Sequence, residues 1–333
     1  TDTLWCDHPI KKSGLVVYIA GEGHNGLGRR LKAWCQHHSI APDDLKLVIS
    51  SRPAQISDAQ YVKIIQDETN NAIEEFDAQG YHVARGVFGA GEIERLKEGY
   101  NYILELAART DLSEDILKGK GREVHIHLQT PDPMVGDKAV QYLRKVQWPS
   151  LIHPAFEEIR ISAKFPALLE PMIGTSLKQY INQINFKMPG GAIAFPWHQD
   201  IRPTPAFRDQ VNNYVQTIIV VDEATQANGC LHVVPGSHKM GNLKVKGYAK
   251  GQVEDHVDVS QAVPCEAAPG DVVMFTSYTV HGSTPNTTDQ SRRSYINGFV
   301  RASSCDVGKW AFLEGNPVPI TSDTDYHDIR WTG

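Results

Sequence analysis

Short apolar stretches separated by glycine- and proline-rich turns fill the second half of the chain, and they limit the folds that it can adopt. Each stretch is too short for a helix of ordinary length. Several such strands, separated by frequent turn residues, predict an all-β sandwich or barrel. The predicted strands cover residues 177–188, 195–200, 214–222, 230–234, 271–275 and 293–301.

The part of the chain that precedes these strands has helical periodicity. Apolar residues recur at helical spacing over 92–108 and 154–172, and a shorter helix is expected to end at Gly80. A strand is predicted at 81–88. Residues 121–148 predict a long irregular loop, which is a candidate lid because long loops in compact domains are often functional. The pattern indicates a mainly β domain with flanking helices.

His198, Asp200 and His281 form the pattern with the clearest chemical meaning. Residues i and i+2 of an extended segment point to the same side, so His198 and Asp200 can reach one ion together. His281 comes far enough along the chain for another strand to return to that place. Two histidines and one carboxylate on one face of an octahedron are the ligands of non-haem Fe(II) oxygenases, and they leave coordination positions open. The triplet alone is weak evidence for a metal site, since the chain has 14 histidines and such a spacing can occur by chance.

The predicted strand 177–188 carries polar residues on one face, among them Gln179, Gln183 and Asn185. That face is either the solvated outside of a sheet or the interior of a barrel that hydrogen-bonds a polar ligand. Arg292 begins the last predicted strand, and its planar charged fork suits a carboxylate. A surface salt bridge is the simpler role for Arg292. Arg293 would point to the opposite face, so only one of the two arginines can bind such a carboxylate.

Five segments, taken in order, resemble the phytanoyl-CoA dioxygenase family over about residues 68–302. They are Asn185–Lys187, Phe195–Asp200, Asn228–His238, Pro269–Phe275 and the stretch from His281 to Arg292.

This resemblance implies a double-stranded β-helix, the jelly-roll barrel of cupins. It implies that His198, Asp200 and His281 bind iron, and that Arg292 binds the distal carboxylate of 2-oxoglutarate with help from Ser283. Asn185 and Phe195 match positions that lie beside the same cosubstrate.

The expected activity is therefore that of an Fe(II)- and 2-oxoglutarate-dependent dioxygenase. With O2 it would hydroxylate an unactivated C–H bond of a small polar or anionic molecule and release succinate and CO2. Asp200 favours hydroxylation, because related halogenases have a small residue in place of this carboxylate. Arg202, Trp197 and Tyr214 are the candidate substrate contacts. The alternative is a metal-binding jelly-roll protein without this activity, which would leave Arg292 and Ser283 unexplained.

Residues 1–66 are expected to form a small α/β extension, and residues 67–333 the dioxygenase domain. Strands predicted at 15–20 and 45–50 enclose a helix at 27–38, which is a β-α-β pattern. Val16–His24 and the residues after it resemble part of the core of phage and plasmid replicative ATPases, so an accessory role in replication is a second alternative. The chain lacks the phosphate-binding GxxxxGK[ST] loop, which favours a packing extension instead.

Composition limits the partners and the location that we expect. A formal net charge of -6 offers no basic face for nucleic acid, and no apolar run approaches the roughly 20 residues that span a membrane. The first residues lack the features of a signal peptide. Five scattered cysteines without a CxxC pair predict a reducing, cytoplasmic location rather than a disulfide framework. A small-molecule substrate and a monomer or homodimer are expected.

Overall fold

The computed structural model describes residues 73–109, 143–189, 194–201, 213–245 and 252–320, together with several short strands outside these ranges. The chain forms two compact units, Thr1–Val62 and Lys63–Gly333. In the first unit β1 (Leu4–Trp5) pairs with β2 (His8–Pro9).

Strand β3 (Val16–Tyr18) pairs with β4 (Leu47–Ile49) in parallel, as the β-α-β pattern predicts. The helix expected at 27–38 lies outside the described residues.

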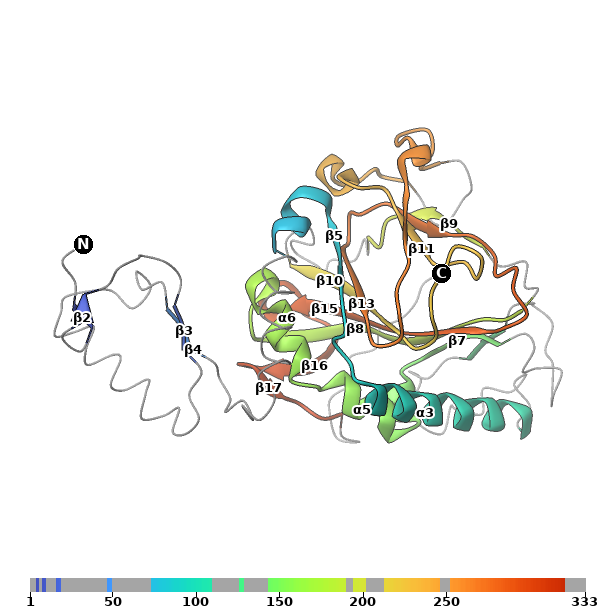
Figure 1. Cartoon of the computed structure of the whole chain (residues 1–333), viewed down its shortest axis with the longest axis horizontal. Helices are drawn as coiled ribbons and strands as arrows, with labels where there is room; N and C mark the ends of the chain where they lie inside the picture. Colours follow the sequence, from blue (N-terminus) through green and yellow to red (C-terminus); the bar gives the residue numbers. More distant parts are fainter. Residues whose placement is uncertain are drawn as a thin grey trace. The chain divides into compact units, whose positions relative to one another are not determined.

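Two antiparallel sheets build the second unit, and the chain passes back and forth between them (Figure 1). From β8 onward, β8, β10, β13 and β15 join the larger sheet, whereas β9, β11, β12 and β14 form the smaller one. This winding is a double-stranded β-helix, which fits the sandwich or barrel that the strand pattern predicts and is the topology that the family resemblance implies. The larger sheet contains β5 (Tyr81–Ala84), β8 (Leu177–Lys187), β10 (Tyr214–Val220), β13 (Val272–Thr276), β15 (Arg292–Arg301), β16 (Lys309–Leu313) and β17 (Asn316–Pro317), and the smaller sheet contains β9 (Phe195–His198), β11 (Leu231–Val233), β12 (Val263–Cys265) and β14 (His281–Ser283).

The prediction of one irregular loop over 121–148 is wrong. Strand β6 (Ile126–Leu128) pairs with β7 (Leu143–Gln147), and β7 pairs with the edge of β8. The strand β7 is not apparent from the sequence, because two charged residues separate its buried ends and interrupt the apolar pattern. The free edge of β8 supplies the ladder partners that such a short segment needs.

The single helix predicted over 154–172 is also wrong, since the segment forms α5 (Pro154–Arg160) and α6 (Lys164–Ile173). A continuous helix would need an amide hydrogen at Pro166 and would push its ring against the carbonyl of Ser162. The other helices agree with their periodicity. Residues 73–79 are helical and end at Gly80, whose φ of 82° suits a glycine, and α3 spans Ala90–Arg109.

None of the helices in the described ranges has the length and apolar character that a membrane crossing needs.

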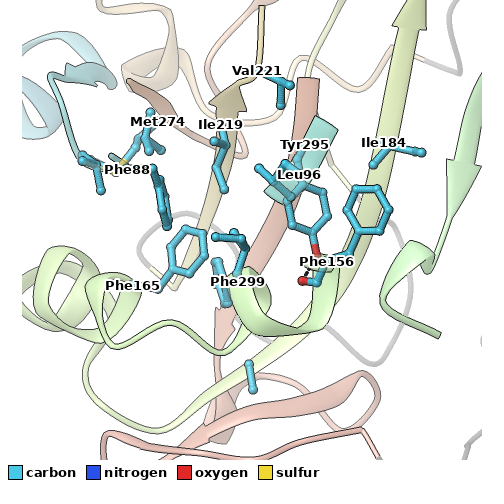
Figure 2. Packing of buried hydrophobic residues seen from close by; sticks show 14 of the residues in the cluster. Phe88, Leu96, Phe156, Phe165, Ile184, Ile219, Val221, Met274, Tyr295 and Phe299 are labelled. Atoms are coloured by element: carbon cyan, nitrogen blue, oxygen red, sulfur yellow. Dashed lines mark hydrogen bonds between the residues drawn. The ribbon is translucent and has the colours of Figure 1, made fainter. Parts of the chain in front are cut away.

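The main hydrophobic core lies between the helices and one face of the larger sheet (Figure 2). Strand alternation divides the residues of β15 between two environments. Tyr295 and Phe299 point into the core, whereas Ser294 and Ile296 line a cavity on the other face. One face of the sheet is therefore used for packing and the other for a site.

Aromatic rings tie α5 to this sheet. The ring of Phe156 lies 5.4 Å from that of Tyr100 and 5.3 Å from that of Tyr295, centroid to centroid. The Tyr295 hydroxyl donates to the Phe156 carbonyl at 2.9 Å and accepts from the Asn182 amide at 2.6 Å. These contacts join α3, α5, β8 and β15 in one packed unit.

Replacing Phe156 with Ala is expected to lower the free energy of unfolding by about 3–5 kcal/mol, because the cavity left among buried rings collapses only in part. Urea denaturation followed by tryptophan fluorescence measures this loss. The matched control is Tyr102→Ala on α3, where the side chain is 40% exposed and a change within about 0.5 kcal/mol is expected. Equal losses for the two variants would contradict the packing role of Phe156.

Candidate metal centre and ligand cavity

Strand pairing in the smaller sheet brings His198, Asp200 and His281 together. His198 ends β9 and His281 begins β14, and the two residues lie opposite each other in the antiparallel ladder. Asp200 follows two positions after His198 on the same side. One ligand atom from each of the three residues lies within 4.8 Å of the other two.

The two imidazole rings are oriented by backbone carbonyls. His198 Nδ1 lies 2.7 Å from the Pro196 carbonyl oxygen, and His281 Nδ1 lies 2.9 Å from that of Thr279. Since a carbonyl only accepts, each Nδ1 carries the hydrogen of this contact, and Nε2 is the ring nitrogen that can bind an ion. Histidines that bind metals are held in this way.

The spacing of the donor atoms suits a metal ion better than it suits direct hydrogen bonds. The Asp200 oxygens lie 3.7 Å from His198 Nε2 and 3.8 Å from His281 Nε2. An ion about 2.1 Å from each donor would fit between them. All three side chains are buried, so water solvates the Asp200 carboxylate poorly. A bound cation would stabilise this buried charge. Two imidazoles and one carboxylate are a ligand set for Fe(II).

A cavity of about 120 Å³ lies between the two sheets, and the three residues form part of its wall. Gln183 and Asn185 on β8 line it, so the polar face of this strand is interior and not solvated. The cavity lining also contains apolar residues from both sheets, Ile218, Val220, Leu231, Val273 and Phe275.

Arg292, Ser283, Asn185 and Phe195 all line this cavity. The Nε–H group of Arg292 is buried and donates to no acceptor among the described residues. Burial lowers the pKa of Arg292, which indicates a cation that lacks water and would gain from an anion. The donor set and the orphaned N–H group fit a carboxylate ligand.

Arg293 lies on the other face of β15, as strand alternation predicts. Its guanidinium donates to both carboxylate oxygens of Asp222, at 2.7 and 2.8 Å, and this hydrogen bonding raises the pKa of Arg293. Arg293 is therefore occupied by an ion pair outside the cavity.

The candidate substrate contacts are placed differently. Trp197 points away from the cavity and packs with Val234 and Val253, because it alternates with His198 along β9. Tyr214 does not line the cavity either, although its hydroxyl donates to Gln216, which does. Arg202 lies outside the described residues.

Three polar residues near the ligands were not singled out from the sequence: Lys145, Lys187 and Gln216. Lys145 and Gln216 line the cavity. Lys187 lies on the same polar face of β8 as Asn185, so the period of two along this strand contained the signal. Lys145 had no such signal, since its strand was predicted to be a loop.

A model of the phytanoyl-CoA dioxygenase (PhyH) family matches residues 76–294. The match covers more than half of the chain, and the chain belongs to this family. Among curated relatives, methylphosphonate hydroxylase of Gimesia maris is 33% identical over 143 residues, which are 43% of this chain and 52% of that protein. The 2-aminoethylphosphonate dioxygenase of the uncultured bacterium HF130_AEPn_1 is 34% identical over 139 residues, which are 41% and 50% of the two chains. The chain spans about half the length of these relatives.

Solved structures agree in fold. EctD from S. alaskensis, crystallised with 2-oxoglutarate and 5-hydroxyectoine, has a TM-score of 0.56 at 19% identity and covers 75% of this chain and 87% of its own. The epimerase SnoN in complex with Fe3+, alpha ketoglutarate and nogalamycin RO has a TM-score of 0.53 at 16% identity, with coverage of 78% and 97%. Both support the double-stranded β-helix.

Removing one imidazole is expected to abolish tight metal binding, since two remaining ligands hold a divalent ion poorly. In His281→Ala, calorimetric titration with Co(II) should show at least a roughly hundredfold loss of affinity. His256→Ala removes an exposed histidine and should leave the Co(II) affinity unchanged. A His281→Ala protein that binds Co(II) as tightly as His256→Ala would exclude this centre.

Proposed function

We propose that this protein is an Fe(II)- and 2-oxoglutarate-dependent dioxygenase that hydroxylates a small polar or anionic molecule. The observation that carries the proposal is one cavity lined by two complementary sets of groups. His198, Asp200 and His281 offer a ligand set for Fe(II), and Arg292 offers a buried guanidinium whose Nε lacks an acceptor. A dicarboxylate cosubstrate that binds a metal at one end needs both.

Fe(II) held by these three residues would supply the activation of O2, coupled to decarboxylation of 2-oxoglutarate to succinate and CO2. The carbonyls of Pro196 and Thr279 keep both Nε2 atoms directed at the ion. Two histidines and one carboxylate leave coordination positions for the cosubstrate and O2. No side chain is required as a general base.

Arg292 would hold the distal carboxylate of 2-oxoglutarate. Its guanidinium can donate two parallel hydrogen bonds to a carboxylate, and Ser283 can add a third. Asn185 and Phe195 line the same cavity, so they are close enough to limit how the cosubstrate lies. Arg293 is held outside by Asp222 and cannot replace Arg292.

The apolar residues of the cavity lining have a separate role. Ile218, Val220, Leu231 and Val273 come from both sheets and contribute no donor or acceptor in their side chains. They limit the water inside the cavity, which protects a reactive oxidant from side reactions.

Small oxyanions are the first substrates to test. Lys145 also lines the cavity, so an ammonium group and the Arg292 guanidinium belong to the same lining. Relatives similar to this chain are named methylphosphonate hydroxylase, 2-aminoethylphosphonate dioxygenase and, in Stutzerimonas stutzeri, probable alpha-ketoglutarate-dependent hypophosphite dioxygenase. Arg202 remains a candidate contact for such an anion.

A cytoplasmic location and a monomer or homodimer complete the proposal. Cys230, Cys265 and Cys305 are free thiols in the described part of the chain, which agrees with a reducing compartment.

The decisive experiment measures succinate from 2-oxoglutarate. Purified protein supplied with Fe(II), O2 and 2-oxoglutarate should form succinate, and a phosphonate panel should contain a compound that accelerates it. Omitting Fe(II) or O2 should stop the reaction. Anaerobic protein that binds Co(II) but no 2-oxoglutarate would instead identify a metal-binding jelly roll of another class.

Arginine variants test the role assigned to the two faces of β15. Arg292→Ala should raise the KM for 2-oxoglutarate by roughly ten- to a hundredfold, because a charge-assisted hydrogen-bond pair is lost. Arg293→Ala removes the ion pair with Asp222 and the contact with the Tyr100 ring, neither of which lies in the cavity, and should change this KM by less than about twofold. If both variants raise the KM alike, Arg292 has no special position. Steady-state succinate assays measure both values.

A further inference from the structure

One amide side chain in the cavity has hydrogen-bond donors that the described residues do not use. Gln216 lies near the start of β10, lines the cavity and is 4% exposed. Its Oε1 atom accepts a hydrogen bond from the Tyr214 hydroxyl, whereas its amide nitrogen has no acceptor among the described residues. A buried donor without a partner destabilises a protein, so stability alone is a poor reason for a glutamine here.

The Tyr214 hydroxyl decides which end of the amide is available to the cavity. Tyr214 is buried in an apolar cluster with Val300 and Cys305, and it does not line the cavity. The oxygen and the nitrogen of a carboxamide lie on opposite sides, and only the nitrogen donates. Because Tyr214 holds Oε1, the Nε2 group is the end of Gln216 that is left for the cavity. Gln216 is therefore oriented as a donor.

A glycine on the neighbouring strand makes room for this pair of side chains. Gly298 lies opposite Gln216 in the ladder of β10 and β15. A Cβ atom at Gly298 would lie 2.2 Å from the Tyr214 hydroxyl oxygen and 2.7 Å from Gln216 Oε1, and both distances are too short for a contact. Glycine weakens the interior of a strand, and it often marks a place that other groups approach closely. The space at Gly298 thus permits the contact between Tyr214 and Gln216.

Gln216 lies close to the candidate metal ligands and far from Arg292. It is opposite Phe275 in the ladder of β10 and β13, and the Phe275 ring lies 4.4 Å from that of His281, centroid to centroid. Arg292 begins β15 six residues before Gly298, and six extended residues span about 20 Å along the strand. The amide of Gln216 is therefore separate from the guanidinium that would hold the distal carboxylate of the cosubstrate.

The neighbours of Gln216 across the larger sheet are apolar. Gly298 pairs with Ile181 on β8 as well as with Gln216, so one row of the sheet contains Ile181, Gly298, Gln216 and Phe275. Ile181 and Phe275 both line the cavity, and neither side chain has an acceptor. An acceptor for the Gln216 amide must therefore come from a molecule that enters the cavity, which is either water or a ligand.

We infer that Gln216 is a specificity-determining residue for the primary substrate, and that its amide donates to an oxyanion oxygen a few bonds from the carbon that is hydroxylated. Tyr214 is the positioning residue that orients the amide. The inference rests on the proposed function, because it needs a primary substrate beside the metal.

The chemistry of an amide donor defines the substrate class. An anionic oxygen accepts such a hydrogen bond more strongly than a neutral oxygen does, so a small phosphonate or carboxylate fits this position. An ammonium group only donates and cannot accept from Nε2. A substrate with an ammonium at this position would leave the donors of Gln216 unpaired, and the site would therefore discriminate against it.

Calorimetry without O2 tests the inference. Anaerobic protein loaded with Fe(II) and 2-oxoglutarate cannot turn over, so titration with methylphosphonate, 2-aminoethylphosphonate or propionate measures binding alone. At least one of these oxyanions should bind to the wild type. Gln216→Leu has a side chain of similar size without the donor, and it should weaken that binding by roughly ten- to a hundredfold because a hydrogen bond to a charged acceptor is lost. Its affinity for 2-oxoglutarate should match that of the wild type.

Gln216→Glu separates the donor from the shape of the side chain. This variant keeps an acceptor for the Tyr214 hydroxyl but replaces the donor with a second, charged oxygen. Repulsion between like charges should make it bind the oxyanion more weakly than Gln216→Leu does. Binding as tight as in the wild type would show that the amide does not donate to the ligand.

Tyr214→Phe tests the positioning role. It leaves Gln216 in place but allows the amide to rotate, so succinate assays should show a KM for the oxyanion that is raised by about three- to tenfold, while kcat changes less. In the background of Gln216→Leu, the same substitution should cause no further loss. The control is Tyr180→Phe, which removes a hydroxyl beside the same apolar cluster and outside the cavity lining, and it should match the wild type.

Each contrary result has a separate meaning. Wild-type protein that binds no 2-oxoglutarate would refute the proposed function itself. Wild-type protein that binds 2-oxoglutarate but none of the three oxyanions would overturn the assigned substrate class. If Gln216→Leu binds the oxyanion as the wild type does, or loses affinity for 2-oxoglutarate to the same extent, the role of Gln216 in substrate recognition is wrong. Additive losses in the double variant would exclude the route from Tyr214 through Gln216.

Discussion

The antiparallel pairing of β9 with β14 is the constraint on which the site depends. It places His281 opposite His198, although most of the barrel separates these residues along the chain. Asp200 joins them because it follows His198 by two extended residues. The larger sheet, packed on α3, α5 and α6, provides the other residues that line the cavity. The arrangement of these three candidate ligands is thus a product of sheet geometry.

Alternation along each strand then divides packing from chemistry. Tyr295 and Phe299 on β15 enter the aromatic core, while Ser294 and Ile296 face the cavity. The same rule places Arg292 in the cavity and gives Arg293 to Asp222. Two positively charged residues lie close together, because Arg292 and Lys187 are opposite each other in the ladder of β8 and β15. Neither forms an ion pair with a carboxylate among the described residues. An anion is the ligand that such a pair favours.

Much of this arrangement could be predicted from periodicity. The period of two along residues 177–188 gave a polar face, and the structure turns that face inward. Strand β7 was missed, since Arg144 and Lys145 interrupt its apolar pattern and its stability comes from pairing with β8. The break between α5 and α6 was also missed, although Pro166 carried the signal. Trp197 is a candidate substrate contact from the sequence, but it alternates with His198 along β9 and does not line the cavity.

The sequence by itself determined the mainly β class, the placement of His198 and Asp200 on one side of the chain and the separation of Arg292 from Arg293, because all three follow from spacing along extended strands. Only the tertiary structure decided which groups lie beside Gln216. Phe275 and Gly298 are far from Gln216 in sequence, and they meet it only when β10 pairs with β13 and β15. Contacts between distant segments depend on sheet register and packing, and local patterns do not encode them.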